Sequence, residues 1–196
     1  MKVSKRVFDL VFVIPGLIIL FPFFVVVAIL IKIDDGGPVF FRQERVGHKG
    51  RLFRIWKFRT MVVDAEKKGM KITVGQDSRV TRIGRILRKT KLDEFPQLFN
   101  VLLGEMSLVG PRPEVKYYVD KYNEAQKEVL NLVPGITDLA SIKYRNESEI
   151  LANSSNAEES YISDIMGSKI SINLQYASKA TRISDFIVIL KTLSSK

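Results

Sequence analysis

The chain has 196 residues, a net charge of +10 and no cysteine. This length is about that of one domain, and the lack of cysteine excludes structural disulfides, thiolate zinc sites and cysteine nucleophiles. The single histidine, His48, lies between glycines in VGHKGR. An exposed loop explains it better than a role as the base of a serine-histidine-aspartate relay.

Residues 10–31 form an apolar run, LVFVIPGLIILFPFFVVVAILI, without a charged residue. The run is long enough for a helix that spans a bilayer. Pro15 and Pro22 lie inside it, and each removes a backbone donor and crowds the preceding turn. Two arrangements are open: a kinked helix that crosses the membrane, and a hairpin that enters one leaflet, breaks at Pro22 and returns. No small-residue cleavage site follows, which argues against a signal peptide.

Basic residues stand on both sides of the apolar run, with Lys5 and Arg6 before it and Lys32 after it. The positive-inside rule therefore predicts that both ends of the run lie on the same side of the membrane, which favours the hairpin. Beyond the run, residues 38–91 carry sixteen Lys or Arg against four acids, and residues 92–196 carry eleven against fourteen. Such a concentration suits a polyanionic ligand or an anionic leaflet.

The rest of the chain predicts a mostly helical α+β domain. After the turn DDGGP, the segments VFFRQERVG and RLFRIWKFRTMVV predict two short strands joined by a glycine loop. A flexible stretch at 69–77 precedes a basic amphipathic helix from Ser78, which suits either a membrane interface or an ordinary surface. Further helices are predicted at 117–132 and 176–193. The predicted parts are a membrane hairpin at 1–33 and a cytosolic domain at 34–196, to which the candidate residues below assign the catalytic role.

The segment TKLDEFPQLFNVLLGEMSLVGPRPE, residues 90–114, holds the strongest candidates for chemistry. Asp93 and Glu94 open an apolar helical pattern, and acids are stabilised there by the helix dipole if Pro96 lies in the first turn. Thr90 and Asp93 also have the spacing of a capping box, so two explanations compete. A catalytic role is favoured because the acids follow many arginines and precede the rigid turn GPRP.

Three segments together resemble a known family: GPVFFRQERVGHKGRLFRIWKFRTM, DSRVTRIGRILRKTKLDEFPQLFNVLLGEMSLVGPRPE and VPGIT. They are similar to the bacterial sugar transferases, the monotopic polyprenyl-phosphate phosphoglycosyl transferases, over about residues 1–137. The resemblance implies transfer of a phosphosugar from a UDP-sugar to undecaprenyl phosphate, with release of UMP, at the cytosolic face of the bacterial inner membrane. It implies downstream glycosyltransferases as partners and no nucleic acid. It also implies the hairpin with its break at Pro22, although Phe21 stands where the family often has serine.

The resemblance and, in parallel, the chemistry of phosphoryl transfer suggest a role for each candidate residue. Asp93 is the expected nucleophile, which forms a covalent phosphosugar intermediate. Glu94 is the expected ligand of Mg²⁺, for which Mn²⁺ could substitute. Arg112, between two prolines, is the expected phosphate clamp. The secondary phosphate-binding candidates, each equally explained by lipid contact or surface charge, are Lys57, Arg59, Arg79, Arg88 and Arg145. Trp56 and Tyr144 could stack on uracil or lie at the membrane interface.

The resemblance weakens after PGIT. Family members often continue with Gly-Trp-Ala-Gln, whereas this chain has Asp138, Leu139, Ala140 and Ser141. The transferred sugar is therefore not predicted. An alternative function is a membrane-anchored, non-catalytic binder of anionic lipid or nucleic acid, which would use the basic stretch but would not need the acidic pair.

Overall fold

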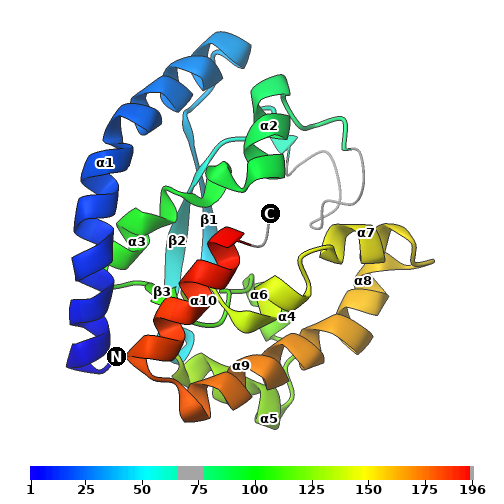
Figure 1. Cartoon of the computed structure of the whole chain (residues 1–196). Helices are drawn as coiled ribbons and strands as arrows, with labels where there is room; N and C mark the ends of the chain where they lie inside the picture. The colour runs from blue at the N-terminus through cyan, green and yellow to red at the C-terminus, as the bar shows by residue number, and fades with distance from the viewer. Residues whose placement is uncertain (66–76, 195–196) are drawn as a thin grey trace.

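The computed structural model describes residues 1–65 and 77–194, and these residues are mostly helical with two small two-stranded sheets (Figure 1). The helices are α1 (Val3–Asp35), α2 (Arg82–Thr90), α3 (Gln97–Leu103), α4 (Lys116–Val119), α5 (Glu124–Lys127), α6 (Leu139–Lys143), α7 (Glu147–Ala152), α8 (Ala157–Ser160), α9 (Gly167–Lys179) and α10 (Arg182–Ser194). Shorter or wider helical turns are η1 (His48–Gly50), η3 (Leu92–Glu94), η4 (Glu128–Asn131) and η5 (Tyr161–Met166). The strands are β1 (Phe40–Val46), β2 (Leu52–Phe58), β3 (Ser107–Val109) and β4 (Gly135–Thr137). The predicted mostly helical α+β fold is confirmed.

The two predicted strands form an antiparallel hairpin. β1 pairs with β2 in a register that joins Phe40 to Phe58 and Val46 to Leu52. The connecting turn contains Lys49 at φ 55° and Gly50 at φ 74°, both in the left-handed region. Most of the flexible stretch predicted at 69–77 lies outside the described residues.

The second sheet brings two distant motifs together. β3 pairs in parallel with β4, and Ser107 and Val109 face Gly135 and Thr137 in the register. Just beyond β3 the two backbones touch, because a Cβ on Gly135 would lie 2.1 Å from the Gly110 nitrogen. Only glycine fits so close an approach. The GPRP turn is thereby held against the PGIT segment.

The structure divides two of the predicted helices. The segment 117–132 is not one helix but α4, α5 and η4, because Asn123 starts a new helix through a capping box with Gln126. The segment 176–193 contains the end of α9 and most of α10, separated where the backbone is extended at Ala180. The predicted basic helix is α2, which starts when the Thr81 side chain accepts a hydrogen bond from the Gly84 nitrogen at 3.0 Å.

The apolar run is one continuous helix. α1 contains 33 residues with Pro15 and Pro22 inside it, so the predicted break of the helix at Pro22 is wrong. A proline removes one intrahelical hydrogen bond, and a long helix can absorb this by bending. The helix is gently curved in Figure 1. It ends at Gly36, which adopts a left-handed conformation at φ 71°. The re-entrant placement in a membrane and the division at residue 33 stay predictions.

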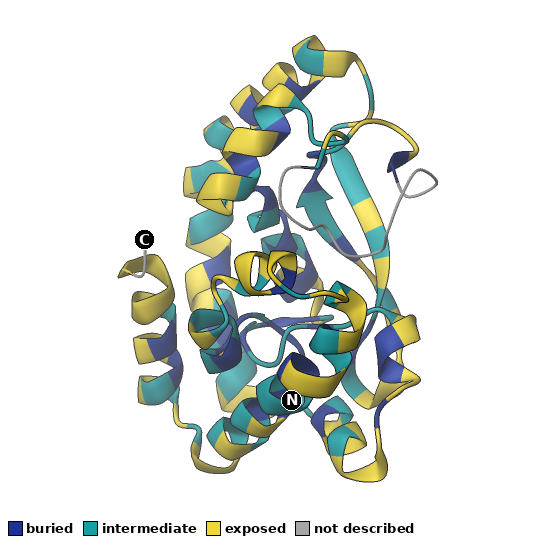
Figure 2. Ribbon diagram, turned by 90° about the vertical axis from the view of Figure 1, so that its right-hand side faces the viewer, coloured by how far each residue is buried: buried dark blue, intermediate teal, exposed yellow. Residues whose placement is uncertain are grey.

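α1 is attached to the rest of the molecule at both ends. Near its start, Lys5 forms an ion pair of 3.1 Å with Asp185 of α10, and at its end Asp35 pairs with Arg59. Between them, buried apolar residues of α1 join the hydrophobic clusters of the body; these are Val13, Phe24, Val27 and Ile31. Many apolar residues of α1 are exposed, among them Ile18, Ile19 and Phe21, and exposed positions recur along the helices in Figure 2. The length and composition of α1 would allow it to cross a membrane.

Candidate active site

The candidate site is an open cleft with a volume of about 780 Å³. One side of the cleft is formed by the β1–β2 hairpin together with α2, η3 and the turn after β3. The other side comes from α7, η5 and α9; α4, which packs against β1, also contributes lining residues. The ionisable residues that line it are Arg42, Glu44, Arg45, Arg54, Lys57, Arg79, Arg88, Asp93, Arg112, Glu114, Glu147 and Lys169, together with three tyrosines, Tyr117, Tyr118 and Tyr161. Cations outnumber carboxylates, so the cleft suits a phosphorylated ligand.

The acidic pair lies in η3, a tight turn between two helices. Lys91 adopts a left-handed conformation at φ 58° and ends α2, and Pro96 is the N-cap of α3. The two acids therefore precede α3 rather than open it. The competing capping box at Thr90 is also absent, because the Thr90 hydroxyl donates to the carbonyl oxygen of Ile86 at 2.8 Å.

Glu94 is held by two cations. Lys57 Nζ donates to Glu94 Oε1 at 2.9 Å, and Arg112 Nη1 donates to Glu94 Oε2 at 2.9 Å. Arg112 Nη2 also contacts Oε1, so the guanidinium binds both carboxylate oxygens. Burial alone would raise the pKa of Glu94, but Arg112 and Lys57 outweigh it and hold that pKa well below its ordinary value. Glu94 is therefore ionised and fixed in place.

Asp93 has a different environment from Glu94, although it directly precedes Glu94 in the chain. It is only 7% exposed and lines the cleft. Burial raises the pKa of Asp93, the positive charge of Lys57 opposes this shift, and the adjacent Glu94 adds to it. Two neighbouring carboxylates thus have opposite pKa shifts, a pattern that separates a reactive group from a supporting one.

Arg112 is placed by the turn and by a buried aspartate. The backbone N–H of Arg112 donates to Asp138 Oδ2 at 3.0 Å, and Asp138 also caps α6 through the Ser141 nitrogen at 2.7 Å. The negative charge of Glu94 raises the pKa of Arg112 above its ordinary value, so the guanidinium stays charged. Its side chain is 34% exposed, so it can contact a ligand while it holds Glu94.

Three of the five secondary candidates line the cleft: Lys57, Arg79 and Arg88. Arg88 is fixed by a hydrogen bond of 2.8 Å from its Nε to the Thr60 hydroxyl. Arg79 is bound to Asp77, with 2.6 Å between Nη2 and Oδ2. These three cations remain candidates for contact with phosphate.

The other two secondary candidates do not line this cleft. Arg59 is buried, and its guanidinium pairs with Asp35 at the end of α1, so it anchors that helix. Arg145 is exposed beyond α6 and is not among the lining residues. Arg59 directly follows β2 and Arg145 lies between α6 and α7. At neither position does the folded chain bring the side chain into the lining of the cleft.

Sequence reasoning missed several lining residues. Arg42, Arg45 and Arg54 lie on the hairpin. Strand alternation places Arg42 and Arg45 on opposite faces of β1, so it could not have located both. Glu114 and Lys169 carried no local signal, because α9 reaches the cleft only in the folded chain. Both residues proposed to stack on uracil have partners within the fold. The Trp56 ring lies 3.6 Å from the Arg42 guanidinium carbon, and the Tyr144 hydroxyl donates a hydrogen bond to Ser168.

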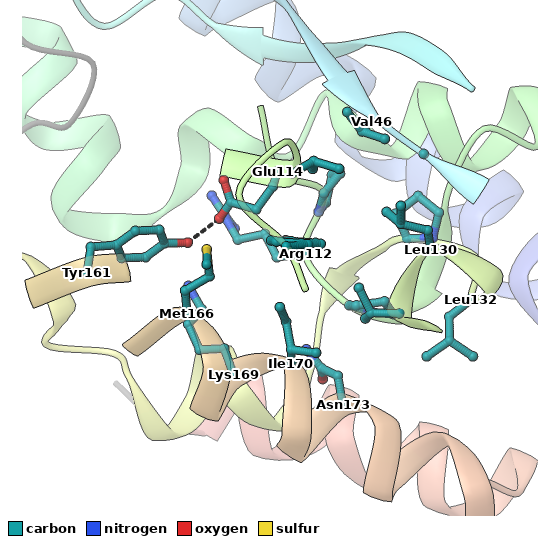
Figure 3. A pocket seen from close by; sticks show the side chains of 17 residues that line it. Val46, Arg112, Glu114, Leu130, Leu132, Tyr161, Met166, Lys169, Ile170 and Asn173 are labelled. Carbon is teal, nitrogen blue, oxygen red and sulfur yellow. Dashed lines mark hydrogen bonds between the residues drawn. The ribbon is translucent and has the colours of Figure 1, made fainter. Parts of the chain in front are cut away.

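A small cavity of about 40 Å³ lies beside the GPRP turn (Figure 3). In this view Tyr161 points to Glu114 and donates a hydrogen bond to its carboxylate. Arg45 approaches the other Glu114 oxygen at 3.8 Å and donates to the Pro113 carbonyl oxygen at 3.3 Å. These contacts connect the GPRP turn to η5 and to the β1–β2 hairpin.

The residues partly fit the implied Mg²⁺. Among the described residues, 1–65 and 77–194, no group of three or more His, Asp or Glu could form a metal cage. Both oxygens of Glu94 already accept hydrogen bonds from cations. A carboxylate offers about four lone pairs, so Glu94 Oε2 retains capacity for one further ligand. Mg²⁺ commonly uses one or two carboxylates together with substrate phosphates and water, so the fit depends on a bound substrate.

The fold and the cleft define a class: a helical protein with a long apolar helix and a phosphate-suited cleft around a buried carboxylate. The chain belongs to the bacterial sugar transferase family, which it matches over residues 1–196.

Individual relatives agree with this membership. Galactosyl transferase CpsE of Streptococcus agalactiae serotype III (strain NEM316) is 39% identical over 204 residues, covering 97% of this chain and 41% of that protein. Exopolysaccharide production protein ExoY of Sinorhizobium fredii (strain NBRC 101917 / NGR234) is 34% identical over 206 residues, covering 97% and 84%. UDP-glucose:undecaprenyl-phosphate glucose-1-phosphate transferase of Klebsiella pneumoniae is 40% identical over 153 residues, covering 76% and 33%. The chain thus spans less than half of two of these three relatives.

Proposed function

We propose that this chain transfers a phosphosugar from a UDP-sugar to undecaprenyl phosphate and releases UMP, through a covalent intermediate on Asp93. The observation that carries this proposal is the contrast within the acidic pair. Glu94 is ionised and paired with Lys57 and Arg112, whereas Asp93 is buried in a cationic cleft with a raised pKa. Family membership and the name of the Klebsiella relative support the substrates.

The reaction proceeds by two displacements at one phosphorus atom. A carboxylate oxygen of Asp93 attacks the sugar-proximal phosphorus, and the bond to the bridging oxygen breaks with its electron pair leaving on UMP. A phosphate oxygen of undecaprenyl phosphate then attacks the same phosphorus and the bond to Asp93 breaks. The carboxylate is regenerated, so atoms and charge balance over the cycle.

The cations of the cleft stabilise the charge that develops on the leaving group. Lys57 and Arg88 are near enough to Asp93 to influence its pKa, as is Arg112. Because Arg112 also binds Glu94, the carboxylate of Glu94 orients the guanidinium that contacts the donor phosphates. Glu94 is the residue that would hold Mg²⁺, and the ion would supply further neutralisation of the charge on the donor diphosphate.

We further propose that the body lies on the cytosolic face of the inner membrane, with α1 embedded from that side. Support comes from the two ends of α1, since Lys5 contacts Asp185 and Asp35 contacts Arg59. A helix that placed its two ends on opposite sides of a bilayer would have to lose one of these attachments. The exposed apolar residues of α1 would contact lipid.

The proposal is tested by measuring UMP release from a panel of UDP-sugars with purified protein and undecaprenyl phosphate. We expect release with at least one donor, dependent on the acceptor for multiple turnovers. The non-catalytic alternative predicts binding to anionic vesicles or nucleic acid without any UMP. Absence of UMP with every donor would reject the proposed function.

A further inference from the structure

The two sides of the cleft differ in their chemistry. The hairpin side, with α2 and the GPRP turn, contributes most of the cations, whose charge suits the donor diphosphate. The opposite wall, formed by α7, η5 and α9, contributes Tyr161, Ser148 and the carboxylate of Glu147, and Lys169 is its one cation among the described residues. A carboxylate repels phosphate but accepts hydrogen bonds from hydroxyl groups. The opposite wall is therefore suited to a neutral ligand rich in hydroxyl groups.

Two charged side chains of that wall, Glu147 and Lys169, form an ion pair. Glu147 Oε2 lies 2.8 Å from Lys169 Nζ, and the side chains are 29% and 13% exposed. Both residues line the same cleft as Asp93. The pair presents an acceptor and a donor side by side, an arrangement that can bind two adjacent hydroxyl groups of a sugar ring.

The wall is joined to the GPRP turn, which indicates the part of the donor that it meets. Lys169 Nζ lies 5.5 Å from the centre of the Tyr161 ring, and Tyr161 donates a hydrogen bond to Glu114. Glu114 follows Arg112 and Pro113 directly in the chain. In a UDP-sugar the phosphorus attacked by Asp93 carries the sugar, while the nucleoside lies one phosphate farther away. A wall next to the Arg112 turn is thus placed for the sugar.

We propose that Glu147 and Lys169 determine the sugar specificity of this chain by hydrogen bonding to adjacent ring hydroxyls of the donor. This inference rests on the proposed function. It locates the sugar-reading residues in the part of the chain where the family motifs no longer guide a prediction. The expected substrate is a hexose whose hydroxyl groups, rather than an acidic substituent, face this wall.

The test compares kcat/KM for UDP-glucose, UDP-galactose and their N-acetylhexosamine counterparts in wild type, Glu147→Gln and Lys169→Met. We expect each variant to lower kcat/KM for the preferred donor roughly tenfold, as for the loss of one or two hydrogen bonds. We also expect the ratio between C4-epimeric donors to shrink by a similar factor. The inhibition constant of UMP should stay within about twofold, because UMP lacks the sugar.

Matched variants separate recognition from stability. Glu124→Gln and Lys127→Met remove an exposed pair of the same residue types, 2.7 Å apart and outside the cleft, and should leave the donor ratio unchanged. The double variant Glu147→Lys with Lys169→Glu keeps an ion pair but exchanges donor and acceptor. If the pair is only structural, this exchange restores the wild-type ratio, which would overturn the inference. If the pair binds the sugar, the exchange leaves the ratio altered.

Three further outcomes have distinct meanings. A weakened UMP inhibition in Glu147→Gln, with an unchanged donor ratio, would assign the wall to the nucleoside and overturn the inference. If the wild type is active and the variants have the same donor ratio as the wild type, the inference is rejected but the proposed function stands. Lack of UMP release by the wild type with every donor would instead reject the proposed function.

Discussion

The backbone N–H of Arg112 donates a hydrogen bond of 3.0 Å to the carboxylate of Asp138, which is 1% exposed. The same carboxylate accepts hydrogen bonds from the Ser141 nitrogen at 2.7 Å and from the Ser141 hydroxyl at 3.0 Å. Asp138 therefore fixes the turn that carries Arg112 and begins α6. Asp138 is a positioning residue, since its contacts reach the site through Arg112.

Replacement of Asp138 by Ala should weaken both the fold and the reaction. Buried donors lose a charged acceptor, so we expect the free energy of unfolding to fall by about 2–3 kcal/mol. A small displacement of Arg112 should lower kcat by roughly tenfold to a hundredfold. Thermal denaturation and UMP release measure the two effects. Ser141→Ala is the control, because it removes one donor and leaves the Arg112 contact; an equal loss of kcat in both variants would contradict this role.

Asp93→Asn should abolish turnover, by about a thousandfold or more, because an amide cannot serve as the nucleophile. Intact-mass analysis of wild-type protein with donor alone should show the added mass of one phosphosugar, located on Asp93 by peptide mapping. The variant should show no adduct while it still binds UMP. Turnover retained in Asp93→Asn would exclude the covalent mechanism.

The raised pKa of Asp93 predicts the acid side of the pH profile. The nucleophile must be ionised, so kcat/KM is full above the folded-state pKa of Asp93 and falls as the pH drops through that pKa. This fall should occur at a higher pH than the ordinary aspartate pKa of about 3.9 would give. Lys57→Met removes a positive charge that lowers this pKa, so the acid limb should move to higher pH. Arg85→Met is the control, since Arg85 is exposed on α2 and does not line the cleft. An acid limb that Lys57→Met leaves unmoved would argue against Asp93 as its origin.

Activity should require Mg²⁺ or Mn²⁺ and be lost in EDTA, because the site offers hard oxygen donors at Asp93 and Glu94. Isothermal titration should show that Mg²⁺ binds weakly to the free protein and more tightly with UDP-sugar present, since both Glu94 oxygens are already engaged. Glu94→Gln should abolish this substrate-dependent binding. Full activity in EDTA would remove the metal from the proposal.

Single cysteines at Ser4 and Arg51 should both react with a membrane-impermeant reagent from the cytosolic side only. Both positions are exposed, and the wild type has no cysteine to interfere. The expectation follows from the attachment of both ends of α1 to one body. Pro22→Leu removes a residue that bends α1 but keeps both attachments, so both positions should still be labelled from the cytosolic side only. Opposite-side labelling in either background would contradict the proposed placement.

The sequence predicted the local features well where one segment contains the whole signal. Alternation and the glycine turn indicated the β1–β2 hairpin, and the apolar period from Ser78 indicated α2. It failed at 117–132 and 176–193, where a capping box at Asn123 and an extended residue at Ala180 interrupt the helical pattern. It also failed at Pro22, because the loss of one hydrogen bond is too small to break a helix that packs along its length.

The acidic pair, the rigid turn at Arg112 and the apolar helix could be predicted from the sequence, because each lies within a short run of residues. Their separate roles could not be predicted, because these depend on contacts between distant elements. Lys57 and Arg112 come from different elements and meet at Glu94, so the difference between Glu94 and Asp93 arises from contacts across the fold. For the same reason Arg59 anchors α1 through Asp35, and Lys169 lies in the cleft. The function of a charged side chain depends on the partner that folding brings next to it.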